Sequence, residues 1–199
     1  MKITVLNHMS LDGIIQSPAR PDEDTRGGFS HGGWAVAGAD EEVGKWVGPP
    51  SAGGAGAMLM GHRSYDDMLG HWNRVGGPFK DALNAARKYV ASRNASTQLA
   101  WPNSSLLTGD VPEAVAKLKR EHDGDLLIMG SGALIHSLVP HNLIDEFRLV
   151  IHPLLLGDGV HLFPDDGELH QLELVDGTHT TKGVILATYR AADHPSTQP

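Results

Sequence analysis

A glycine, two basic residues and a serine follow a short apolar segment near position 60, and this combination could bind a phosphate group. Residues 57–60 are only Ala, Met and Leu, and the residues directly after them are Gly61, His62, Arg63 and Ser64. An uncharged run that ends at a glycine is typical of a buried strand, and the helix-like segment 65–69 comes directly after it. The first turn of a helix binds anions through its free backbone N–H groups, and an arginine there adds charge-assisted hydrogen bonds. This junction predicts a bound nucleotide cofactor.

A second junction of the same kind lies after the predicted strand 125–129. It contains Gly130, Ser131, Gly132 and Ala133, and the helical segment 133–138 comes next. Glycine lets the backbone approach a ligand closely, which suits a pyrophosphate. A packing turn explains a single Gly-x-Gly junction equally well, and the full Gly-x-Gly-x-x-Gly fingerprint of a Rossmann domain is absent. The presence of two junctions in one chain is the stronger evidence.

The elements that must position these junctions alternate between strands and helices and then end in strands alone. We expect helices at 39–47, 65–69, 79–86, 111–120 and 133–138, and strands at 2–7, 57–60, 88–92, 105–108, 125–129, 147–151, 171–175 and 184–189. This order predicts a three-layer α/β fold with a mixed, mostly parallel central sheet, helices on both faces and antiparallel C-terminal strands. Ligands of such folds bind beyond the carboxyl ends of the parallel strands. The loop 17–33, rich in Pro, Gly and charged residues, is a candidate substrate lid.

Composition narrows the class of protein. The 199 residues predict one domain, 1–191, followed by a disordered tail, 192–199. We expect a cytoplasmic protein without a membrane partner, because no apolar run approaches the roughly 20 residues of a membrane span and no signal peptide is recognisable. The absence of cysteine excludes disulfides and thiolate chemistry, and the net charge of −8 argues against a nucleic-acid partner. The 12 histidines lack metal-ligand spacing, which favours surface or packing roles and no metal site.

Four segments, in order along the chain, resemble the dihydrofolate-reductase-like superfamily. The branch most similar includes the reductase domain of bacterial riboflavin biosynthesis. The matching segments are 10–15 (SLDGII), 61–65 (GHRSY), 130–132 (GSG), and 143–147 (LIDEF) with 153–163 (PLLLGDGVHLF). As a set they are fairly specific, although each is loose by itself.

The resemblance implies NADPH as the cofactor. The family's Gly-Arg-x-Thr junction, on the 2′-phosphate side, reads Gly61-His62-Arg63-Ser64 here, so His62 stands at the usual arginine position. The sequence leaves open which of these two basic residues binds the phosphate, and with it the preference for NADP over NAD. Ser92 and Arg93 resemble the family's second adenosine-phosphate contact, and Gly130–Ala133 resembles its pyrophosphate turn. A solvated surface charge is the alternative for either arginine.

The nicotinamide end and the proton donor are expected near the beginning of the chain. Residues that resemble those around the nicotinamide ring are Met9, Ser10, Asp12 and Ile15. Dihydrofolate reductases use one acidic residue on a helix just after a tryptophan, and Asp40 follows Trp34 in a similar order. Asp12 and Asp40 are therefore the candidate catalytic residues. The alternatives are a turn role for Asp12 and stabilisation of a helix N-terminus for Asp40.

The function that this resemblance implies is hydride transfer from NADPH to a small heterocyclic substrate such as a pterin or a pyrimidine. The resemblance also implies a homodimer, with 147–151 and 184–189 as interface strands unless they fill the core. Three alternatives stay open: a non-catalytic nucleotide-binding protein on the same fold, a flavin- or deazaflavin-dependent reductase, and a metal-dependent hydrolase that uses the histidines.

Overall fold

One eight-stranded sheet organises the part of the chain that the computed structural model describes, residues 1–48, 55–121 and 124–192. The strand order is β4-β3-β2-β5-β1-β6-β8-β7, and all neighbours are parallel except the last two pairs, β6 with β8 and β8 with β7. The strands are β1 (Ile3–Ser10), β2 (Ala55–Gly61), β3 (Arg87–Ala91), β4 (Ser104–Leu107), β5 (Asp125–Met129), β6 (Glu146–His152), β7 (Leu172–His179) and β8 (Ile185–Ala191). This arrangement confirms the predicted fold class and the antiparallel C-terminal end.

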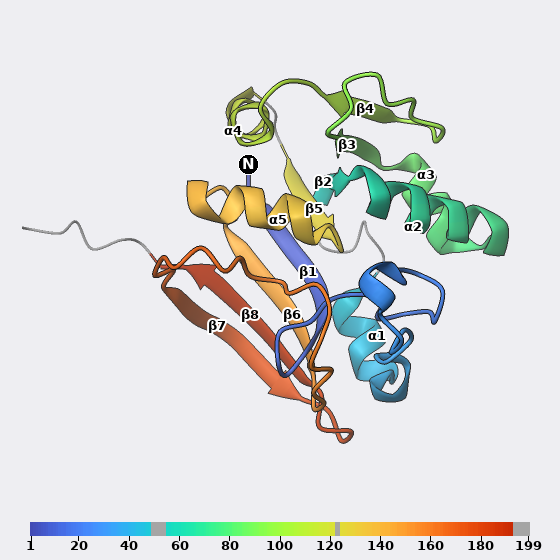
Figure 1. The fold of residues 1–199 in the computed structure, drawn as a ribbon, viewed down its shortest axis with the longest axis vertical. Helices are drawn as coiled ribbons and strands as arrows, with labels where there is room; N and C mark the ends of the chain where they lie inside the picture. Colours follow the sequence, from blue (N-terminus) through green and yellow to red (C-terminus); the bar gives the residue numbers. More distant parts are fainter. Residues whose placement is uncertain (49–54, 122–123, 193–199) are drawn as a thin grey trace, which may run out of the picture.

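Helices cover both faces of the sheet, because the parallel strands carry apolar side chains on both sides. On one face, α4 (Val111–Glu121) and α5 (Gly132–Leu138) pack on alternate residues of β1 and β5. On the other face, α2 (His62–Val75) and α3 (Pro78–Ala85) cover β2 and β3, while α1 (Glu41–Val47) covers β6 and β8. Short 3-10 helices lie at Arg26–Gly28, Val36–Gly38 and Val139–His141. Figure 1 shows β6, β8 and β7 at the end of the sheet far from β4.

The predicted interface strands have different surroundings. Strand β6 lies inside the sheet between β1 and β8, and most of its residues are buried, so it fills the core. The exposed large apolar side chains of this region are on β7 and at the start of the other predicted strand, β8: Leu172, Leu174, Val175 and Ile185. The predicted disordered tail lies outside the described residues except for Ala192, whose N–H donates to the Gln171 carbonyl at 3.0 Å.

Several element boundaries differ from the sequence expectation, and two of these differences concern candidate site residues at the carboxyl edge of the parallel strands. Strand β1 continues to Ser10, three residues past the expected end at position 7, so Met9 and Ser10 belong to the strand. Its pairing with β5 stops at Leu6 and Met129, whereas its pairing with β6 continues to Ser10 and His152. Helix α2 begins at His62, so the predicted phosphate-binding residues form its first turn.

Two histidines contact each other on the α1 side of the sheet. His8 Nδ1 lies 2.9 Å from His152 Nε2, and His152 is almost fully buried. The Trp34 ring meets the His152 ring edge-on, and the Trp34 indole N–H donates to the Gln16 carbonyl at 2.7 Å. Burial, together with the neighbouring His152, lowers the pKa of His8 to about 4. The pair is therefore built for the neutral form of both rings.

Within the described residues no helix is long and apolar enough to cross a membrane, and no group of three or more histidine and carboxylate side chains could hold a metal ion.

The His8 pair predicts a loss of stability in mild acid. The pKa of His8 is about 4 in the folded state and 6.5 in a model peptide, so the unfolded chain binds the proton more tightly between these values. Stability is therefore lost as the pH falls through this window, by about 2 kcal/mol between about pH 7 and about pH 5. Urea unfolding of the wild type and of His8→Gln at both pH values measures this. The variant should lose clearly less stability on acidification, and an equal loss in both proteins would contradict the assignment.

Candidate nucleotide-cofactor site

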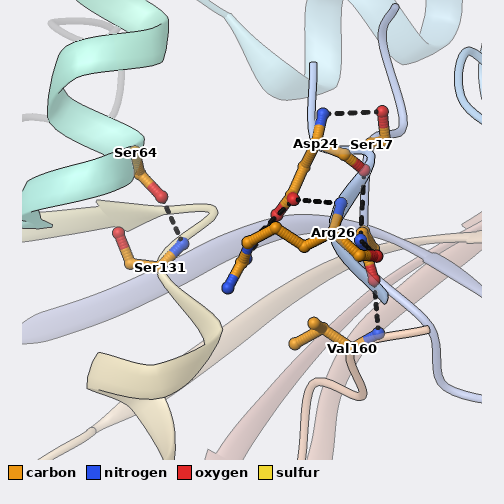
Figure 2. A network of polar contacts seen from close by, with 7 residues as sticks. Ser17, Asp24, Arg26, Ser64, Ser131 and Val160 are labelled. Atoms are coloured by element: carbon orange, nitrogen blue, oxygen red, sulfur yellow. Dashed lines mark hydrogen bonds and ion pairs between the residues drawn. The ribbon is translucent and has the colours of Figure 1, made fainter. Parts of the chain in front are cut away.

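The two predicted phosphate-binding junctions are in direct contact. Ser64, in the first turn of α2, accepts a hydrogen bond from the Ser131 N–H at 2.9 Å. The Ser131 hydroxyl in turn accepts from the Gly61 N–H at 3.0 Å and donates to the Met129 carbonyl at 3.2 Å. Figure 2 shows Ser64 and Ser131 facing each other across this contact. Because β2 and β5 are parallel neighbours, their carboxyl ends place Arg63 and Ser131 at the same edge of the sheet.

The turn at Gly130 and Ser131 has a backbone conformation that the surrounding side chains enforce. Both residues have positive φ, +61° and +62°. The side-chain amide of Asn7 accepts from the Gly130 N–H at 2.6 Å and donates to the Gly130 carbonyl at 3.2 Å. A Cβ on Gly130 would lie 3.1 Å from the Ser64 hydroxyl oxygen, so the close approach of the two junctions needs glycine here. Asn7 and Ser64 thus hold the turn from two sides.

The two helices that begin at the junctions differ from α1 and α4 in having no side-chain cap. Asp40 accepts from the Val43 N–H at 2.8 Å at the start of α1, and Asp110 accepts from the Glu113 N–H at 3.0 Å at the start of α4. No side chain caps α2 or α5, the two helices that begin at the junctions. Helix α3 has no side-chain cap either, but its first residue is Pro78, which has no N–H. The N–H groups in the first turn of an uncapped helix have no hydrogen-bond acceptor within the helix. The two junctions therefore fit an anionic group such as a phosphate.

Of the two basic residues at the start of α2, one is engaged and one is available. His62 lies 3.1 Å from Asp66 on the next turn of the helix. Arg63 is exposed and forms no ion pair within the part of the chain that the structure describes. The positive charge of Arg63 is one of the causes that lower the pKa of Asp24 in the loop between β1 and α1. The geometry favours Arg63 as the partner of a phosphate.

Ser92 and Arg93 lie at the same edge, directly after β3. The Ser92 hydroxyl lies 2.7 Å from the Thr97 hydroxyl and accepts from the Asn94 N–H at 3.2 Å, whereas Arg93 is exposed. A hollow of about 460 Å³ opens beside the carboxyl end of β4, lined by residues 106–110 and by one side of α4. This hollow lies at the same carboxyl edge of the parallel strands as the two junctions.

The Asp12 carboxylate accepts several hydrogen bonds from neighbouring residues. It accepts from the Ser10 hydroxyl at 2.5 Å, from the Leu156 N–H at 3.0 Å and from the Gly157 N–H at 2.7 Å. The Ser10 hydroxyl and then the Gly157 N–H are the main causes that lower the pKa of Asp12 to about 2. A carboxylate with this pKa is ionised at neutral pH and is unsuited to donating a proton. The geometry favours the turn role for Asp12, which joins the end of β1 to residues 156–157, while a catalytic role stays a prediction.

The other residues predicted near the nicotinamide are largely buried. Met9 and Ile15 belong to the core under α5, and Ser10, which has no exposed surface, accepts from the Ile14 N–H at 2.9 Å. Asp40 has the capping position that was the alternative to catalysis, with one of its oxygens engaged. Contacts of these residues with a cofactor or a substrate stay predictions.

Asn7 and the individual residues of the loop 17–33 are parts of this region that the sequence alone did not single out. Asn7 is expected only as part of the first strand, although an amide at the end of an apolar run is a recognisable signal. Gln16, just before the loop, donates to the carbonyls of Asp24 and Arg26 at 3.1 and 3.0 Å, and accepts from the Val160 N–H at 3.0 Å. No local pattern indicates these long-range partners.

Comparisons with known proteins agree with the fold described above. Among solved structures, a protein from Shewanella sp. PV-4 named for riboflavin biosynthesis has a TM-score of 0.72 at 21% identity, with 97% of this chain and 100% of that chain covered. A pyrimidine reductase-like protein from Corynebacterium diphtheriae has a TM-score of 0.59 at 12% identity, covering 96% and 92%. Dihydrofolate reductase from Enterococcus faecalis, complexed with NADP(H), has a TM-score of 0.56 at 14% identity, covering 96% and 97%. These likenesses show a dihydrofolate-reductase-like fold.

Sequence comparison gives the family. The uncharacterized protein YyaP of Bacillus subtilis strain 168 is 35% identical over 108 residues, 54% of this chain, and the chain spans only 56% of the length of that relative. The model of the RibD C-terminal domain family matches residues 1–186, nearly the whole chain. The chain belongs to the RibD C-terminal domain family.

Proposed function

We propose that this protein is a reductase that transfers a hydride from NADPH to a small heterocyclic substrate. The observation that carries the proposal is the contact between Ser64 and Ser131, which joins two uncapped helix N-termini at the carboxyl edge of the sheet. Membership of the RibD C-terminal domain family and a fold shared with dihydrofolate reductase support it. NADPH, when bound, supplies the hydride, and the residues of the chain bind and orient it.

The described residues offer a partner for each charged part of the cofactor. The first turns of α2 and α5, with the Gly130–Ala133 turn, suit the pyrophosphate. Arg63, and beyond it Arg93 at the end of β3, suit the 2′-phosphate and the adenosine side. The carboxyl half of β1, where β5 no longer pairs with it, is the part of the sheet that we assign to the nicotinamide end.

The substrate class follows from the family and stays part of the proposal. A pterin, a pyrimidine or a similar conjugated ring accepts a hydride at carbon and needs a proton at a neighbouring nitrogen. Asp40 is the candidate proton donor, since its carboxylate has one oxygen that caps α1 and a second oxygen without a hydrogen bond inside the described residues. A cofactor-binding protein without turnover is the second candidate, which the engaged carboxylate of Asp12 favours.

The homodimer expected from the resemblance also stays a proposal. The exposed apolar residues Leu174, Val175 and Ile185 offer a surface for a second copy, in place of the buried strand β6. Light scattering that shows only monomer would count against it.

Substitution of Gly130 tests the cofactor site. In Gly130→Asp, a carboxylate enters next to the Ser64 hydroxyl and repels phosphate, so NADPH binding measured by calorimetry should weaken by about a hundredfold or more. Gly76→Asp is the matched control, because Gly76 also has positive φ but ends α2 with nothing within 4 Å of an added Cβ. Failure of the wild type to bind NADPH at sub-millimolar concentration would exclude the proposed function. Bound flavin in the isolated protein, seen by absorbance, would favour a flavin-dependent reductase instead.

Asp40→Asn separates capping from catalysis. Asparagine caps a helix about as well as aspartate, so the free energy of unfolding should change by less than about 0.5 kcal/mol, whereas Asp40→Ala should cost about 1 kcal/mol. If Asp40 donates the proton, Asp40→Asn should lower kcat by about a hundredfold or more with the best substrate of a heterocycle panel. Unchanged kcat in Asp40→Asn would assign Asp40 to capping alone. NADPH binding without oxidation across the panel would support the second candidate.

A further inference from the structure

We propose that Arg26, in the loop between β1 and α1, is a further phosphate-binding residue that contacts the pyrophosphate of the dinucleotide from the side opposite α2 and α5. The inference rests on the proposed function, because it assigns a residue to the same cofactor. Arg26 lies outside the segments that resemble the family, and the loop carries no recognised motif. Three observations carry the assignment: how the loop is fastened, where the arginine points, and which charges surround it.

The loop is fastened against both junctions. Arg20 forms an ion pair with Asp67 of α2 at 2.5 Å, which ties the loop to the helix that begins at His62. On the α5 side, a Cβ added to Gly132 would lie 2.9 Å from a Val160 methyl group and 3.3 Å from the Ile15 side chain. Gln16 then joins Val160 to the carbonyls of Asp24 and Arg26. The segment that carries Arg26 is therefore held next to the first turns of α2 and α5.

Arg26 is oriented by Asp24 and keeps unused donors. Its backbone N–H donates to one Asp24 oxygen at 3.2 Å and its Nε–H donates to the same oxygen at 2.7 Å, while Nη2 donates to the other oxygen. A guanidinium has five N–H donors, so three remain. The Arg26 side chain is 51% exposed, whereas that of Asp24 is 17% exposed. Figure 2 shows the guanidinium extending from the loop toward Ser64 and Ser131.

Two arginines act on Asp24, in a loop that also carries Asp22 and Glu23. Burial tends to raise the pKa of Asp24, but the hydrogen bonds from Arg26 and the charges of Arg26 and Arg63 outweigh this and lower it. Asp24 is thus an ionised carboxylate influenced by two guanidinium groups, and the three groups together carry one net positive charge. A phosphate group of a nucleotide would meet both arginines there. The competing explanation is an ion pair that only shapes the loop.

A set of nucleotides that differ in their phosphates decides between these explanations. NADPH, NADH and ADP contain a 5′-diphosphate, whereas 2′-AMP contains only the 2′-phosphate. In Arg26→Gln, calorimetry should show that NADPH, NADH and ADP bind roughly ten to a hundred times more weakly, while 2′-AMP binding stays within about twofold. Arg26→Lys, which keeps the charge but loses the planar fork, should fall between the wild type and Arg26→Gln.

Arg87→Gln is the control for the change in net charge. Arg87 is exposed at the first residue of β3, at the opposite edge of the parallel strands, so this variant should bind all four nucleotides like the wild type. Unchanged ADP affinity in Arg26→Gln, or an equal loss for 2′-AMP and ADP, would overturn the assignment of Arg26. Wild-type protein that fails to bind NADPH but binds ADP through Arg26 would refute the proposed function and leave the anion site standing. Wild-type protein that binds none of the four refutes both.

Discussion

The hydrogen bonds that join Ser131 to the start of α2 are the constraint on which the candidate site depends. Ser131 has a left-handed backbone conformation, which costs a non-glycine residue on the order of 1 kcal/mol. Its N–H and its hydroxyl bond to Ser64 and Gly61, and the flanking Gly130 is bonded twice by Asn7. Three parallel strands, β2, β5 and β1, are thereby locked at their carboxyl ends. The bonds also consume the N–H groups of Gly130 and Ser131, so a phosphate must use the donors further into α5 and α2.

The same constraint explains which parts of the molecule the sequence predicts well. Every strand and every α-helix of the described residues is expected from the sequence, because buried parallel strands form short apolar runs and the helices between them carry amphipathic or capping patterns. The nearness of the two junctions follows from the observed strand order, since the neighbouring parallel strands β2 and β5 end at one edge. The boundaries at Ser10 and His62 are less accurate. No turn residue interrupts the chain between Asn7 and Ser10, and Gly61 ends β2 directly before the first residue of α2.

Contacts between residues far apart in the chain are the part of the structure that the sequence could not provide. His8 and His152 are 144 residues apart in the sequence, and no motif around either histidine indicates the contact. Gln16 reaches Val160 over a similar separation, and Asp12 reaches Leu156 and Gly157. A local pattern reports periodicity and turn chemistry, whereas these bonds depend on register between β1, β6 and the loop after β6. The carboxylates of Asp12 and Asp40 illustrate the consequence. The residue type suggests a proton donor, whereas in the structure both carboxylates accept hydrogen bonds from backbone N–H groups.

In these polar contacts the surroundings of each titratable side chain determine its charge: the two histidines are neutral, and the aspartates are ionised. His152 is buried against Trp34 and His8 contacts it, so a charged imidazole would be costly there, and the one bond between the two rings needs a single proton. Asp12 and Asp24 are ionised because hydroxyl, N–H and guanidinium donors converge on them. Neither aspartate can give a proton to a substrate without losing the bonds that hold its loop. In the reaction we propose, the proton for ring reduction would therefore have to come from a group with an unengaged oxygen or nitrogen. Of the two catalytic candidates, only Asp40 has such an oxygen within the part of the chain that the structure describes. Asp12 and Asp24 instead hold the turn at residues 156–157 and the Arg26 side chain in place.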